Sequence, residues 1–206
     1  MPATTARTSQ ALTARSRRTR VALIDAVRTD LRATGSFTAA TVASGAGCSP
    51  ATFYSHFGTK DDALTAAFEQ TLIELVDGSA TQLSTARFEE RGVRHTVVAF
   101  VQWQAEFFRL ESLVFRNALS RLPEHQPLRA AYRRAEEQTL DHLTATFARL
   151  QATGLVRPEA DAAALAEAFM IASQGLNNPR AIRADAVAQR AALATGISGM
   201  LTTKGI

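Results

Sequence analysis

Hydrophobic residues recur at intervals of three and four along most of the chain, the spacing that places side chains on one face of an α-helix. The alternation of single polar and apolar residues that marks a half-buried strand is not seen. The chain is therefore predicted to be all-α. The predicted helices cover residues 17–33, 38–45, 50–56, 60–77, 93–108, 110–120, 128–153, 158–177 and 183–202.

Two segments lack this pattern. Residues 1–16 are rich in Thr, Ala, Ser and Arg, and we expect a flexible basic arm there. Residues 78–90 mix small, polar and charged side chains, which predicts a frayed helix end followed by a connection.

Two short helices joined by a glycine turn are predicted between residues 38 and 56. Thr38 and Ser49 are suited to cap the two helix starts. Pro50 then occupies the first helical position, where its missing amide costs no hydrogen bond. Because Gly45 and Gly47 end the first helix, the segment is predicted to be a helix-turn-helix.

A capping box follows directly. In the sequence Thr-Lys-Asp-Asp at residues 59–62, Thr59 can cap a helix while Asp62 reaches back to the main chain, so this helix is predicted to begin at Lys60. Leu64, Phe68 and later apolar residues continue at helical spacing. The helix is therefore expected to connect the helix-turn-helix to a second body.

Residues 38–64 resemble the helix-turn-helix signature of the TetR family of transcriptional regulators. The matching positions are Thr38, Val42, Ala43, Ala46, Gly47, Cys48, Ser49, Thr52, Tyr54, His56, Phe57, Thr59, Lys60, Asp61 and Leu64. The resemblance implies a three-helix DNA-binding domain, which we place at 17–64, and a C-terminal helical domain for ligand binding and dimerisation at 65–206. It also implies a homodimer that acts on a palindromic operator as a repressor.

The charge distribution agrees with DNA as a partner. Residues 1–60 carry eight basic and two acidic side chains, a net charge of +6, whereas the remainder of the chain carries a net charge of −2. Duplex DNA attracts a basic segment, and its binding weakens as salt rises. Arginines of the arm can reach phosphates or a minor groove, or the arm can be a solvated tail without a specific role.

The short helix at 50–56 is predicted to lie in the major groove of the DNA. Its groove-facing residues are Pro50, Ala51, Thr52 and Ser55. None of them is an arginine or asparagine of the kind that reads a base with two hydrogen bonds, so the bases that are read are not predicted.

Contacts with the DNA backbone are expected beside this helix. Tyr54, His56 and Lys60 match family positions that commonly touch the backbone, and Lys60 stands at a helix start, where free amides favour a phosphate. Thr38, with the nearby Thr41, is a further candidate, and Ser49 completes the predicted DNA-binding set. The alternatives are a core position with an exposed hydroxyl for Tyr54 and a plain helix end for His56.

Aromatic residues are concentrated between residues 88 and 115, which hold six of the 14 in the chain. We expect some of them to line a cavity for an apolar or aromatic molecule, as the resemblance implies, although an ordinary core is the alternative. The candidate ligand-binding residues are Phe100, Trp103, Gln104, Phe107, Phe115, Tyr132, Phe147, Phe169, Met170 and Gln174.

A ligand in this cavity is predicted to move the helix that begins at Lys60, and so to change the separation of the two recognition helices. That separation must match about one DNA turn, roughly 34 Å. Two other functions stay open: a DNA-binding regulator without a small-molecule ligand, and a small helical hydrolase that uses Ser49.

Alanine-rich stretches at 162–175 and 186–194 predict close helix packing. Two such helices can pair with those of a second copy as a four-helix bundle, or they can form the core of a monomer.

Enzyme and metal signatures are incomplete in the sequence. Ala51 replaces the last glycine of a nucleophile elbow, and the four histidines share no metal-ligand spacing with each other or with Cys48. No catalytic residue, metal or cofactor is predicted. The longest hydrophobic runs are five residues, far short of the roughly 20 that cross a bilayer, and one cysteine suits a reducing compartment, so we expect a cytoplasmic protein.

Overall fold

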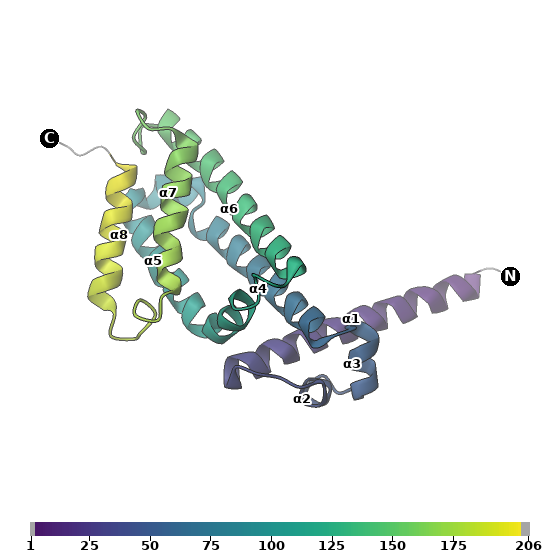
Figure 1. The fold of residues 1–206 in the computed structure, drawn as a ribbon. Coiled ribbons are helices and arrows are strands. Elements are labelled where there is room, and N and C mark those ends of the chain that lie inside the picture. Colours follow the sequence, from purple (N-terminus) through teal and green to yellow (C-terminus); the bar gives the residue numbers. More distant parts are fainter. Residues whose placement is uncertain (1–2, 203–206) are drawn as a thin grey trace. The chain divides into compact units, whose positions relative to one another are not determined.

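The computed structural model describes residues 3–202, with side chains from Thr13 onward, and every regular element in this range is a helix, which confirms the all-α prediction. The elements are α1 (Ala3–Thr34), α2 (Ala39–Gly45), α3 (Pro50–His56), α4 (Lys60–Gln82), α5 (Thr85–Leu119), α6 (Gln126–Ala152), α7 (Ala162–Gln174), the 3-10 turn η1 (Gly175–Asn177) and α8 (Val187–Leu201) (Figure 1).

The chain forms two compact units, and each draws on separate stretches of sequence. The N-terminal unit holds the described residues up to Gln70 together with the segment Leu113–Leu128. The C-terminal unit holds Thr71–Ser112 and the chain from Arg129 onward. Helices α4, α5 and α6 therefore each supply residues to both units, a division that the continuous ranges 17–64 and 65–206 do not anticipate.

Helix α1 begins earlier than expected. It starts at Ala3 rather than at residue 17, so the predicted arm is helical over residues 3–16, while residues 1–2 lie outside the described residues. Neither glycine nor proline occurs between Ala3 and Thr34, so nothing in this stretch strongly opposes a helix.

Helix α5 joins two segments that were predicted to be separate helices, 93–108 and 110–120. The stretch between Val93 and Leu119 contains no glycine or proline, so no residue there ends a helix. The real interruption lies at Gly92, whose φ of 74° and ψ of 166° are not helical. Helix α4 likewise continues beyond Gly78 to Gln82, so most of the predicted connection at 78–90 is helical.

The last two helices start later than predicted. The side chain of Asp161 caps α7, where its Oδ1 accepts a hydrogen bond of 2.8 Å from the amide of Ala164. Residues 183–186, which were predicted to be helical, precede α8, and Arg183 forms a salt bridge of 2.7 Å with Asp185 there. Helices α7 and α8 run side by side (Figure 1).

The core of the N-terminal unit includes the end of α5, the start of α6 and the residues between them, which together we call the α5–α6 corner (Leu113–Leu128). The ring of Phe115 packs edge-on against Phe68 of α4, with centroids 5.3 Å apart. The Nδ2 of Asn117 donates a hydrogen bond of 3.0 Å to the carbonyl oxygen of Gly35, just beyond α1. The corner therefore supports both α1 and α4 within this unit.

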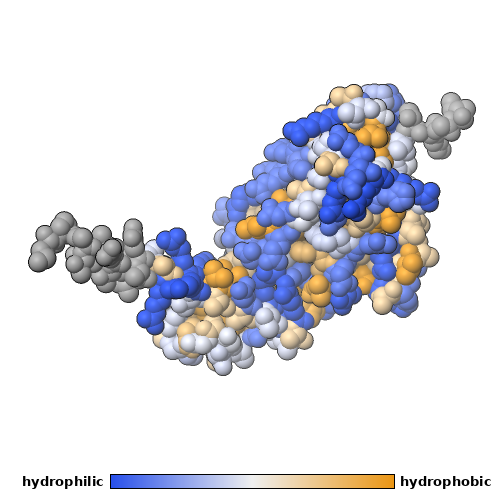
Figure 2. Space-filling view, turned by 180° about the vertical axis from the view of Figure 1, so that it is seen from behind, coloured by the Kyte–Doolittle hydropathy of each residue, from blue (hydrophilic) through white to orange (hydrophobic). Residues whose placement is uncertain are grey.

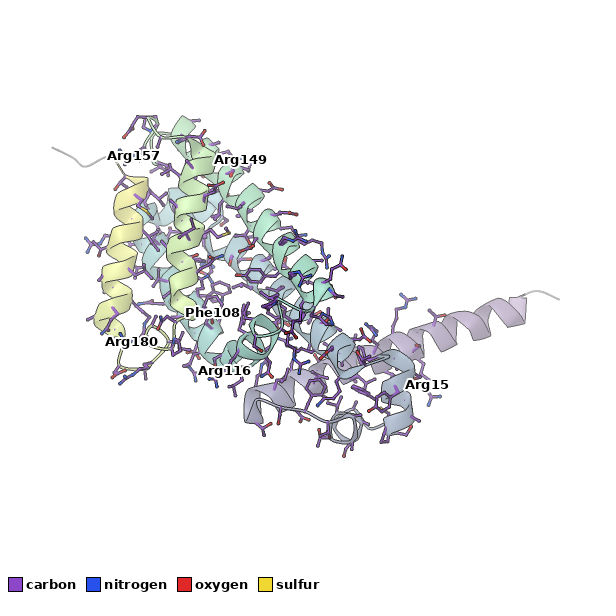
Figure 3. The ribbon with its side chains drawn as sticks, viewed as in Figure 1. Arg15, Phe108, Arg116, Arg149, Arg157 and Arg180 are labelled. Carbon is purple, nitrogen blue, oxygen red and sulfur yellow. The ribbon has the colours of Figure 1, made fainter. Side chains whose placement is uncertain are left out.

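The core of the C-terminal unit contains a continuous row of rings, the aromatic row: Phe88, Phe147, Phe169, Phe100, Trp103 and Phe107. Successive centroids along it lie 6.4, 5.6, 5.3, 6.1 and 5.7 Å apart. Figure 3 shows side chains filling the space between the helices of this unit.

Candidate nucleic-acid interface and ligand site

Helix α2 starts where the sequence predicts. The amide of Thr41 donates to the Thr38 hydroxyl at 3.1 Å, and the amide of Thr38 donates to the Thr41 hydroxyl at 3.1 Å, so the two threonines cap each other. The Thr41 hydroxyl also donates to the Asp30 carboxylate of α1 at 2.5 Å. These bonds fix the first turn of α2 against α1.

The turn between α2 and α3 depends on Gly47. This residue has a φ of 65°, a conformation that glycine adopts without strain, and the amide of Cys48 then donates to the carbonyl of Ala43 at 2.9 Å. Ser49 caps α3 by accepting a hydrogen bond of 3.2 Å from the amide of Thr52, and Pro50 follows at the first helical position. The predicted caps and turn of the helix-turn-helix are thus confirmed.

Two phenylalanines hold α3 to the core of its unit. Phe53 and Phe57 are 0% and 2% exposed, and their ring centroids lie 5.4 Å apart. The other side of this short helix faces solvent. There Tyr54 is 55% exposed and packs edge-on against Phe53 at 5.2 Å, so the alternative of a core position for Tyr54 does not hold.

The other predicted DNA-binding residues of the helix-turn-helix are accessible too. Thr38, Ser49, Pro50, Ala51 and Ser55 are exposed, and Thr52 and His56 are half-buried. In Figure 2 the surface over α2 is pale, because its residues are small and weakly polar. Small side chains let a helix-turn-helix approach a nucleic acid closely.

Lys60 lies at the start of α4, beside this surface. The capping box predicted there is confirmed: the amide of Asp62 donates to the Thr59 hydroxyl at 3.0 Å, and the amide of Thr59 donates to Asp62 Oδ2 at 2.9 Å. The Lys60 Nζ lies 5.0 Å from the centroid of the Phe37 ring, and the side chain is exposed. Phe37 therefore supports the lysine while its charge stays accessible.

Basic residues of α1 belong to the same unit. Arg15, Arg17, Arg18 and Arg20 are all exposed, and Arg15 is labelled on α1 in Figure 3. Arg20 makes contacts that the sequence analysis missed: it donates a hydrogen bond of 2.8 Å to the carbonyl oxygen of His56. The position of Arg20 in the sequence could have indicated this contact. It lies three residues before the buried Leu23 and therefore on the core-facing side of α1.

The candidate ligand-binding residues lie in different surroundings. Phe100, Phe147 and Phe169 are buried in the aromatic row, and Trp103 and Phe107 are half-buried at its end. Gln104 is 5% exposed, and its Oε1 has no hydrogen-bond partner among the described residues. Such an acceptor in an apolar interior favours a donor that comes from elsewhere.

The remaining candidates lie nearer the surface or in the other unit. Tyr132 and Met170 are half-buried and Gln174 is exposed, with its Nε2 donating to Glu136 at 3.0 Å. Burial raises the pKa of Tyr132, and the negative charge of Glu136 raises it further, so this phenol is neutral at physiological pH. Phe115 belongs to the N-terminal unit, where it packs on Phe68.

Two open grooves in the C-terminal unit are lined by other residues. One, of about 440 Å³, follows α5 from Arg91 to Gln102, and the other, of about 470 Å³, lies between α6 and α7. None of the candidate ligand-binding residues lines either groove.

No group of three or more His, Cys, Asp or Glu side chains in residues 3–202 is arranged to hold a metal ion. None of the described helices has the length and apolarity needed to cross a bilayer. Ser49, the nucleophile of the hydrolase alternative, has its oxygen engaged in capping α3.

No protein-family model and no curated protein matches the sequence. Several solved structures, by contrast, have a similar fold over most of the chain. A TetR transcription regulator from Haloarcula marismortui, 19% identical, aligns over 89% of this chain and 96% of its own with a TM-score of 0.72. The fold is that of TetR-family regulators.

Two further solved structures match over similar lengths. Salmonella enterica GusR is 20% identical and covers 89% of this chain and 95% of its own, with a TM-score of 0.68. Bacillus subtilis FadR, a transcriptional regulator solved in complex with stearoyl-CoA, is 15% identical, covers 88% and 98%, and has a TM-score of 0.63. The resemblance seen in residues 38–64 is thus confirmed at the level of the fold.

Proposed function

We propose that the protein is a ligand-responsive transcriptional regulator of the TetR family, which binds a palindromic operator as a homodimer. The observation that carries the proposal is a fully capped helix-turn-helix on a TetR fold, with α3 held from beneath by Phe53 and Phe57 and exposed on its other side. A helix held in this way can enter a major groove while Phe53 and Phe57 stay in the core of the N-terminal unit.

Operator binding is tested with the full chain and a duplex that it selects from a random library. Tyr54→Ala and Lys60→Ala should each weaken binding about tenfold, since each removes a contact expected at the DNA backbone. Arg149→Ala is the charge-matched control, because Arg149 is exposed on α6 in the C-terminal unit. If both variants bind as tightly as the wild type, or the control weakens binding equally, the assigned surface is wrong.

The homodimer is expected to form through α7 and α8. Their solvent face combines small residues such as Ala164, Ala191 and Ala192 with two large exposed side chains, Ile171 at 67% and Val187 at 64% exposed. Small side chains allow helices of two copies to pack closely, and the isolated large ones add apolar area.

A charge placed on this face should separate the copies. Ile171→Asp is expected to shift the protein to monomers in analytical ultracentrifugation and to weaken operator binding with it. Ile73→Asp is the matched control, because it makes the same substitution at a position that is 52% exposed but lies on α4, outside the proposed interface. Unchanged mass in Ile171→Asp would place the dimer interface elsewhere.

The effector is proposed to be a small apolar or aromatic molecule whose binding releases the repressor from DNA. The aromatic row and the unpaired Oε1 of Gln104 support this, because together they offer apolar contacts and one buried acceptor. Helix α4 supplies residues to both units, so it is a direct path from ligand to DNA. A coupling of about 1 to 3 kcal/mol is typical of such switches.

A regulator without a small-molecule ligand is the second candidate, favoured by the close ring contacts within the aromatic row. A thermal-shift screen of aromatic and acyl compounds separates the two. An effector should raise the melting temperature because it binds the folded protein, and it should lower operator affinity because it favours the conformation that is released from DNA. A screen without hits would favour the second candidate.

A further inference from the structure

Arg20 connects α1 to the C-terminal end of α3. Its Nη1 donates a hydrogen bond of 2.8 Å to the main-chain carbonyl oxygen of His56, the last residue of α3. Its Cζ lies 4.5 Å from the centroid of the ring of Phe57, the residue that follows. One side chain thus contacts both residues at which the helix ends.

The position of Arg20 on α1 explains this reach. Leu23 and Val27, three and seven residues later, are fully buried and define the core-facing side of the helix. Arg20 continues that side by one turn toward the N-terminus, beyond the edge of the core. Its stem can therefore run along the core while its guanidinium stays at the exposed end of α3.

The contact satisfies a physical need of α3. The last carbonyls of a helix have no partner within it, and they form the negative end of the helix dipole, so a cation there is favourable. The guanidinium also lies over an aromatic face, which attracts cations. Because α3 has only seven residues and cannot be stable alone, its direction depends on what holds its ends. Ser49 holds one end and Arg20 the other.

We propose that Arg20 is a positioning residue for operator recognition, which fixes the C-terminal end of α3 instead of pairing with a DNA phosphate. This inference rests on the proposed function, namely operator binding through α3. It separates Arg20 from Arg15, Arg17 and Arg18 of α1, which are exposed and can contact the DNA backbone. Loss of Arg20 should therefore lower sequence-specific binding while the number of phosphate contacts stays the same.

The test compares Arg20→Ala with Arg17→Ala in the full-length protein. Both variants remove one exposed charge from α1, so they are matched in charge and location. Fluorescence anisotropy measures binding at several KCl concentrations to a duplex selected by the wild type and to a scrambled duplex of the same length. Hydrogen exchange of the peptide covering α3 is followed without DNA.

Arg20→Ala should weaken binding to the selected duplex about tenfold and to the scrambled duplex by less than about twofold, with an unchanged salt slope. Exchange in α3 should rise in Arg20→Ala and not in Arg17→Ala. An equal loss on both duplexes, with a slope reduced by about 1.8 because the homodimer carries two copies of Arg20, would identify Arg20 as a phosphate contact and overturn the proposal. Unchanged binding or unchanged exchange in α3 would overturn it as well.

Arg20→Lys covers the case in which Arg20→Ala unfolds the N-terminal unit. Lysine keeps the charge, but its ammonium cannot bond the carbonyl and lie flat over the ring as a guanidinium does. About a threefold loss on the selected duplex with an unchanged slope is expected, and wild-type behaviour would overturn the proposal. If the wild type prefers no duplex at all, the proposed function itself fails, whereas a failure confined to the Arg20 variants refutes only this inference.

Discussion

Gly78 is the point at which α4 approaches the only tryptophan of the chain. A Cβ atom at this position would overlap Cζ2 of Trp103 and would lie 2.7 Å from its Cη2. The ring has little room to retreat, because it lies between Phe100 and Phe107 in the aromatic row, at centroid distances of 6.1 and 5.7 Å. Gly78→Ala should therefore overpack the contact between α4 and α5.

Two opposing contributions set the size of the effect. Overpacking costs about 1–3 kcal/mol, and replacing glycine by alanine inside a helix returns about 1 kcal/mol. We expect the free energy of unfolding to fall by about 1 kcal/mol, which corresponds to a decrease of roughly 2–4 °C in melting temperature for a chain of this length. Tryptophan fluorescence should shift as well, because Trp103 must move.

The background Trp103→Ala provides the decisive comparison. The three atoms nearest to the added methyl group all belong to the indole, so without it Gly78→Ala should stabilise the protein by about 1 kcal/mol. Circular dichroism during urea unfolding, at one fixed protein concentration, measures both effects. The reasoning is refuted if Gly78→Ala stabilises the protein while Trp103 is present, or if its effect has the same sign in both backgrounds.

Three further predictions concern local contacts. Thr59→Ala should lower the free energy of unfolding by about 1 kcal/mol and Thr59→Ser much less, since serine keeps the cap; equal losses in urea unfolding would contradict this. Burial raises the pKa of Tyr132, so a phenolate titration should show a step above the ordinary tyrosine pKa of about 10, and Tyr132→Phe should remove that step. The stability that this neutral phenol contributes is present below about pH 10 and is lost as pH rises through its folded pKa; a phenolate titration that Tyr132→Phe leaves unchanged above pH 10 would contradict this. Asn117→Ala removes a partly buried hydrogen bond, so it should cost about 1 kcal/mol and speed amide exchange at the end of α1; unchanged exchange there would show that the bond contributes nothing.

The sequence predicts best those features that neighbouring residues decide. The caps at Thr38, Ser49 and Thr59 involve partners three residues away, and all three are formed as expected. The exposed side of α3 is equally local, because Phe53 and Phe57 are one turn apart and define the buried side. These neighbouring residues therefore suffice to predict the helix-turn-helix from the sequence.

Features that depend on distant residues are not visible in the sequence. Arg20 and His56 are separated by 36 positions, and Asn117 and Gly35 by 82, so no local pattern links them. The helix end predicted after Phe108 was wrong for another reason. Leu110 is exposed, so it interrupts the apolar face of α5 without ending the helix. The ring contacts of the aromatic row likewise join α5, α6 and α7, whose pairing only the fold determines.

The α5–α6 corner limits how this protein can be recombined with its relatives. An exchange of DNA-binding parts by a single crossover after Gln70 would leave the new N-terminal unit facing a foreign corner. Asp61 would lose its ion-pair partner Arg121, and Phe68 would lose the ring of Phe115. A functional chimera therefore has to carry two pieces of the gene, one for each stretch that builds the unit.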